Sequence, residues 1–183
     1  MKQKNLILRI GSIFLVAMTA LLLLCSCTQE QEGAPNSPEG VAQAYIESIF
    51  DGDTQQLLDL IPEQVMGQVE AEGGFANEEE LRSGLEEQLQ TALETLDAFG
   101  ITVDYRVSGV ATVENISDLQ NAYQEFGITV MYARTVSIEI DVTFSSTDLR
   151  NTQLKDVGTV LIDGSWYLDI SSLDGWDNMI PKS

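Results

Sequence analysis

The spacing of apolar residues changes at Gly100, and this change limits the chain to folds that combine helices with strands. Before Gly100, leucines recur every three or four positions, as on one face of an amphipathic helix. Asn77 followed by Glu80 is typical of a helix start, and Gly100 of a helix end. After Gly100, apolar and polar residues alternate, as in a half-buried strand. The expected buried stripe of the helix is Leu81, Leu85, Leu89, Leu93, Leu96 and Phe99, and the inward side of the strand is Ile101, Val103, Tyr105 and Val107.

The rest of the second half repeats the alternating pattern. Residues 128–144 alternate over a length that predicts one long antiparallel strand, bent or bulged. Residues 157–162 and 166–170 flank Asp163-Gly164-Ser165, which predicts a closing hairpin. A short helix is expected at residues 116–126, with Asn115 as its N-cap, although Asn115-Ile116-Ser117 also matches a glycosylation acceptor.

The first half predicts the helices that cover this sheet. Ser37 and Pro38 favour a helix start, and Gly52 ends that helix. Asp53 caps a second helix, and Pro62 precedes a third. These amphipathic helices are the only candidates to cover an apolar sheet face. We therefore expect an α+β domain in which N-terminal helices pack on one face of a curved antiparallel sheet whose other face is polar.

This order of elements resembles the NTF2-like superfamily, whose members fold as a cone of helices against a bent sheet. The segment SPEGVAQAYIESIFDGDTQQLLDLIP resembles the start of small exported lipoproteins with that fold, and VGTVLIDGSWYLDI resembles their last hairpin. The long helix 77–99 and the helix 116–126 depart from the simplest pattern, which leaves the strand order open. Members of the superfamily are isomerases, dehydratases, ligand binders and interaction modules, so the resemblance does not choose among these functions.

The N-terminus has the pattern of an export signal. Lys2, Lys4 and Arg9 precede a mostly apolar run at residues 10–24. As a helix this run would span about 22 Å, which is short of the ~30 Å hydrocarbon core of a bilayer. The length and the charges favour a signal peptide, residues 1–26, over a transmembrane anchor.

The end of the run, Leu24-Cys25-Ser26-Cys27, resembles the bacterial lipobox. By that resemblance Cys27 carries a diacylglycerol and becomes the mature N-terminus, anchored at the extracytoplasmic face of the cell membrane. Cys25 fits the motif less well, because bulky Leu24 precedes it. A disulfide, a free thiol pair or an uncleaved anchor are the alternatives. Residues 27–36 are then expected to be a flexible tether, residues 37–172 the domain, and residues 173–183 a C-terminal tail.

Charge and composition exclude several classes of function. The chain has 9 Lys and Arg against 29 Asp and Glu, and loss of the signal would remove three of the cations, for a net charge of about −23. Such a body repels phosphate backbones, so no nucleic-acid partner is expected. The acidity favours solubility, and a basic partner or a cell-wall cation is the alternative. The absence of His, and of Cys after Cys27, argues against zinc, copper and haem, so no cofactor is expected.

The residues expected to face the helices include no carboxylate, because Glu139, Asp141 and Asp169 fall on the opposite face. We therefore expect no enzyme. Arg134 shares the inward parity of Tyr132, and together they could hold a carboxylate or phosphate. Alternatively Arg134 lies at the rim, pairs with a helix Glu, or is turned outward by a bulge.

The expected function is non-catalytic binding of a small molecule, a peptide or an envelope protein. The candidate ligand-binding residues are Tyr105, Tyr132, Arg134 and Trp166. The alternative is an interaction or structural module whose cone is filled by side chains, and a small isomerase or dehydratase of the same fold comes third. A calcium loop at Asp51-Gly52-Asp53 is not supported, because Pro62 stands where the twelfth-position Glu is needed.

Overall fold

A computed structural model describes residues 36–145 and 149–170, all of which belong to one compact unit, Pro35–Ser183. The expected signal peptide, Cys27 and the tail 173–183 lie outside the described residues.

The first three helices of the described residues begin where the capping residues predicted. α2, Pro38–Asp51, starts at Ser37, whose hydroxyl accepts from the Gly40 N–H at 3.0 Å. α3, Thr54–Asp59, starts at Asp53, which accepts from the Gln56 N–H. α4, Glu63–Gly73, follows Pro62. Between α2 and α3, Gly52 adopts the left-handed region at φ 70°, which favours glycine. Asp51 is thus the last residue of α2, and Asp53 is the N-cap of α3.

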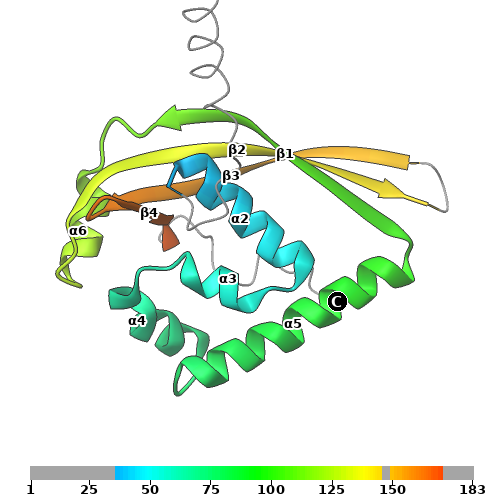
Figure 1. Cartoon of the computed structure of the whole chain (residues 1–183), viewed down its shortest axis with the longest axis horizontal. Helices are drawn as coiled ribbons and strands as arrows, with labels where there is room; N and C mark the ends of the chain where they lie inside the picture. Colours follow the sequence, from blue (N-terminus) through cyan, green and yellow to red (C-terminus); the bar gives the residue numbers. More distant parts are fainter. Residues whose placement is uncertain (1–35, 146–148, 171–183) are drawn as a thin grey trace, which may run out of the picture. The chain divides into compact units, whose positions relative to one another are not determined.

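The long helix α5, Glu78–Ala98, is confirmed, but its predicted buried stripe is only half right. Asn77 accepts from the Glu80 N–H, and the Glu80 carboxylate accepts from the Ala76 N–H. The first half of the stripe is buried, Leu93 and Leu96 are half-buried, and Phe99 is 66 % exposed, so the prediction for Phe99 was wrong. The reason is that the last turns of α5 leave the other helices to join the sheet (Figure 1).

Four antiparallel strands in the order β1-β2-β3-β4 form the sheet. They are β1 Ile101–Thr112, β2 Val130–Phe144, β3 Leu149–Ile162 and β4 Ser165–Leu168. The α+β class and the hairpin at Asp163-Gly164 are confirmed. β3 begins at Leu149 rather than at residue 157 as expected, because its first half is polar and is held by pairing with β2 rather than by an apolar pattern of its own.

A short helix, α6, Ser117–Gln124, connects β1 to β2. Asn115 was expected to be its N-cap, but Ile116 occupies that position and has no side-chain cap. Asn115 instead accepts from the Ser117 N–H at 3.1 Å, which is an Asx turn just before the helix.

Helix α2 lies against the inner side of the curved sheet and contacts all four strands, while α3, α4 and α5 lie beyond it (Figure 1). The expectation of one polar face holds for β1, where half-buried and exposed residues alternate, but fails near β4. There the neighbours Thr159 and Val160 point to opposite faces, and both have an exposed fraction of 0 %. The sheet is therefore covered on both sides at this end.

Candidate functional site

The side of the sheet that faces α2 is fully covered at its centre and only partly covered at one end. Val136 and Ile138 of β2 are 0 % and 1 % exposed. The next three residues of β2 on the same face are only half-buried, and so are the three β1 residues paired with them. We call these six residues the apolar strip: Ile101, Val103, Tyr105, Ile140, Val142 and Phe144.

The strip is only partly covered because α2 ends beside its first row. Phe50, in the last turn of α2, stacks on Tyr105 with ring centroids 5.9 Å apart and planes at 15°. The last part of β2 and the first part of β3 continue past α2 (Figure 1). Leu149, which pairs with Phe144, is 63 % exposed, and Phe99 precedes the strand that carries the other half of the strip. The apolar surface therefore extends to the end of the sheet.

Acidic side chains border the inner end of the strip. The pKa of Tyr105 is raised above its usual range, first by burial and then by the carboxylates of Glu47 and Asp51. Both belong to α2. A negative potential at this place disfavours anionic ligands and favours cationic ones.

Three of the four predicted ligand-binding residues lie near one another. Tyr132 of β2 and Trp166 of β4 both pair with Leu161 of β3, so they flank it in one row. Arg134 lies one row further along the same face. Tyr105 pairs with Ile140, six residues from Arg134, or about 20 Å of strand. The structure therefore brings Tyr132, Arg134 and Trp166 onto neighbouring rows and leaves Tyr105 in the apolar strip.

The Arg134 guanidinium is engaged by the backbone. A bulge between Val130 and Tyr132 precedes Arg134. Its Nη1 donates to the Ala133 carbonyl oxygen at 3.1 Å, and the side chain is half-buried. Tyr132 is more than half exposed. The guanidinium is therefore held by the backbone, beside an exposed tyrosine.

A network of charged side chains joins three strands on the outer face of the sheet. Asp141 of β2 accepts from Arg150 and Thr152 of β3, and Arg106 of β1 lies 3.5 Å from it. Arg106 also pairs with Glu139. The hydrogen bond from Arg150, followed by that from Thr152, holds the pKa of Asp141 below its usual range. Sequence reasoning placed Glu139 and Asp141 on this face but missed the network, because Arg150 lay outside the predicted strands.

Asp169 was expected on a polar, exposed face of the sheet, but its carboxylate is buried. Tyr123 of α6 donates its hydroxyl to Asp169 Oδ1 at 3.2 Å and accepts from the Ile170 N–H at 3.3 Å. Burial, and then the Asp169 carboxylate, raise the pKa of Tyr123. The amphipathic pattern of α6 did not reveal this pair, since only the fold brings α6 to the end of β4.

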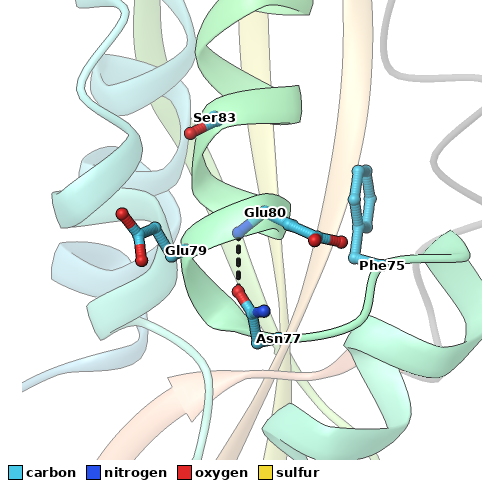
Figure 2. A pocket seen from close by; sticks show the side chains of 5 residues that line it. All are labelled: Phe75, Asn77, Glu79, Glu80 and Ser83. Atoms are coloured by element: carbon cyan, nitrogen blue, oxygen red, sulfur yellow. Dashed lines mark hydrogen bonds between the residues drawn. The ribbon is translucent and has the colours of Figure 1, made fainter.

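A pocket of about 560 Å³ lies at the start of α5, as Figure 2 shows. Its two carboxylates complement the positive end of the helix dipole, and Asn77 already occupies the Glu80 N–H. The two carboxylates make this pocket unfavourable for an anion. Its lining residues are Phe75, Asn77, Glu79, Glu80 and Ser83, none of them from the apolar strip.

Within residues 36–145 and 149–170, no helix is both long and apolar enough to span a bilayer. The same residues contain no cluster of three or more Cys, Asp or Glu side chains suited to hold a metal ion.

Comparison with protein-family models, with curated proteins and with solved structures gave no match.

Proposed function

We propose that the chain is a lipid-anchored protein of the extracytoplasmic face of a bacterial cell membrane, and that its domain binds a partner without catalysis. The anchor is Cys27, which would carry the diacylglycerol. Support comes from the basic start, the short apolar run and the Leu24-Cys25-Ser26-Cys27 segment. We also propose that the α+β domain is an NTF2-like cone, with α2 on the inner side of the curved sheet.

The observation that carries the binding proposal is the uneven cover of the α2-facing side. Apolar side chains are fully buried at Val136 and Ile138 and only partly buried along the apolar strip. Contiguous exposed apolar surface on a soluble domain is typical of an interaction site. The partner would complete the cover that α2 begins.

Charge complementarity indicates the chemistry of that partner. Glu47 and Asp51 border the strip, and the chain as a whole has a net charge of −20. A partner that is both apolar and basic would gain from burial and from attraction. We therefore propose an apolar, Lys- or Arg-containing segment of an envelope protein or peptide.

The anchor is tested by mass spectrometry of the N-terminal peptide from the membrane-purified protein. We expect residue 27 to be the first residue and to carry a diacylglycerol. Cys27→Ser should remain unprocessed, whereas Cys25→Ser should be processed as the wild type is. Retention of residues 1–26 on the wild-type protein, or a processing block by Cys25→Ser alone, would contradict the assignment.

Binding is tested with a synthetic peptide of Leu and Lys and a comparator of Leu and Glu. Val103→Glu, in the strip, should weaken binding of the Leu/Lys peptide about tenfold or more, since tenfold corresponds to about 1.4 kcal/mol. Thr102→Glu is the matched control, because it adds the same charge at the next residue on the outer face. Thermal melting of both variants confirms that they are folded.

The alternative is an interaction or structural module with a solid interior. It is favoured by the filled centre of the domain, where Tyr45 and Ile138 are each 1 % exposed. Equal binding of the Leu/Lys peptide by the Val103→Glu and Thr102→Glu variants would support this alternative over the strip.

A further inference from the structure

No described residue pairs with the outer edge of β3 along most of its length. β4 pairs only with Thr159–Ile162, and the Asp169 N–H donates to the Gly158 carbonyl oxygen as the last bond of that ladder. Among the described residues, no backbone group bonds to this edge between Leu149 and Val157. All the side chains from Leu149 to Leu154 are exposed. A long free edge of this kind is a template for a further strand.

The backbone groups that face outward can be identified from the hairpin. Ile162 and Ser165 flank the two-residue turn, so their pair is hydrogen-bonded, and every second residue of β3 before Ile162 also points toward β4. The bond to Gly158 follows this alternation. No register shift interrupts β3 between Leu149 and Gly158. The N–H and C=O groups that point away from β2 on the free segment therefore belong to Arg150, Thr152, Leu154 and Asp156.

We propose that a second copy of the chain pairs with this edge, β3 against β3 in antiparallel orientation about a twofold axis at Gln153. A twofold interface presents the same surface from both copies. Hydrogen bonding requires that outward-facing residues oppose one another, which allows axes at Thr152, Gln153 or Leu154 near the middle of the segment.

Charge selects among these registers. An axis at Gln153 places Arg150 opposite Asp156 of the partner subunit, twice by symmetry, and directly opposed opposite charges stabilise a strand pair. The axis at Thr152 sets Arg150 against Leu154 of the partner subunit, and the axis at Leu154 sets it against Gly158 of the partner subunit. At Gln153, Lys155 faces Asn151 of the partner subunit, so no like charges meet.

The edge segment is locally basic although the chain as a whole is acidic. Arg150 and Lys155 are two of the six basic residues that follow Cys27, and Asp156 is the only carboxylate between Leu149 and Val157. The segment therefore adds no net negative charge where two acidic domains would approach each other. Because the remaining repulsion is long-range, association should strengthen as salt rises to about 0.15 M, where charges more than ~8 Å apart are largely screened.

The test is disulfide trapping in the full-length protein, purified from membranes in detergent. In the proposed register residue 153 faces residue 153 of the second copy in a non-hydrogen-bonded pair, with Cα atoms about 4.5 Å apart, which suits a disulfide. Gln153→Cys should therefore form a dimer under mild oxidation, and a reductant should reverse it. Asn151→Cys is the matched control on the same face, because its two copies would lie roughly 13 Å apart. The wild type, whose sequence contains no cysteine other than Cys25 and Cys27, gives the background.

Asp156→Lys in the Gln153→Cys background should abolish the trapped dimer, because the new lysine would face Arg150 of the partner subunit. The melting temperature of this variant shows whether the fold is kept. Equal trapping of Gln153→Cys and Asn151→Cys would overturn the proposal. So would trapping that Asp156→Lys leaves unchanged, or a protein that remains a single copy in detergent at both low and moderate salt.

Discussion

The Tyr123 hydroxyl donates to Asp169 Oδ1 at 3.2 Å and so joins α6 to the chain that follows β4, 46 residues further along the sequence. The same oxygen accepts from the Ile170 N–H. The side chains of Tyr123 and Asp169 are buried, with exposed fractions of 2 % and 5 %. This hydroxyl therefore supports a buried carboxylate and a partly buried backbone N–H at the end of the sheet that is covered on both faces.

Tyr123→Phe should destabilise the protein by about 1–3 kcal/mol, because it takes a partner from the buried Asp169 carboxylate and from the partly buried Ile170 N–H. Tyr132→Phe is the control, since Tyr132 is exposed and its change should stay within about 0.5 kcal/mol. The measurement is urea unfolding followed by circular dichroism. Equal effects of the two variants would show that the Tyr123 contact contributes nothing.

Asp141→Asn should lower the melting temperature at neutral pH, because it removes the negative charge and one of the two carboxylate oxygens that accept from Arg150 and Thr152. The folded-state pKa of Asp141 is depressed below 3.8. Its contribution is therefore complete above the unfolded-state pKa and is lost as pH falls through the folded-state pKa. The gap between wild type and variant should be widest near neutrality and should narrow below about pH 3.9. Melting curves from pH 7 to pH 2.5 measure it.

Asp104→Asn is the control for this pH dependence, because Asp104 pairs with Asp141 across β1 and β2 on the same outer face. Removal of that carboxylate relieves a like-charge pair. We expect no loss of stability at neutral pH from Asp104→Asn, and a drop as large as that of Asp141→Asn would contradict the role given to the Arg150 and Thr152 contacts.

Ile138→Ala and Ile140→Ala should differ in cost although both residues lie on the same face of β2. Ile138 is fully buried under α2, so its truncation should cost about 2–5 kcal/mol. Ile140 is half-buried in the apolar strip and should cost clearly less. Chemical unfolding of both variants measures the difference. If the two costs are equal, α2 does not end where the strip begins.

Glycine-to-alanine changes should have opposite signs at two positions. Gly52→Ala forces a side chain into φ 70° and brings its Cβ within 3.2 Å of Leu93 Cδ1, so we expect a loss of about 1–2 kcal/mol. Gly67 lies inside α4, where an added Cβ meets nothing within 4 Å. Gly67→Ala should stabilise by about 0.5–1 kcal/mol. Thermal melting of both variants checks the signs, and a stabilised Gly52→Ala variant would refute the backbone argument.

Part of the candidate site was within reach of the sequence. Alternation along residues 101–107 and 136–144 placed Tyr105 and the other strip residues on the inner face, because side chains of a strand alternate whatever covers them. Where α2 stops relative to those strands was not readable, because it depends on how the helix docks. The contact of Arg150 with Asp141 was also not readable from the sequence, because the first half of β3 is specified by its pairing with β2.

The sequence by itself determined the features that act within a few residues: the helix starts at Ser37, Asp53 and Asn77, the turn at Asp163-Gly164, and the change of apolar spacing at Gly100. Hydrogen bonds to nearby N–H groups and the geometry of helix and strand suffice for these. The tertiary structure alone decided which apolar residues stay exposed, as for Phe99, and which polar ones become buried, as for Asp169. Burial is a property of the segments that meet in space, and their positions depend on contacts between residues far apart in the chain.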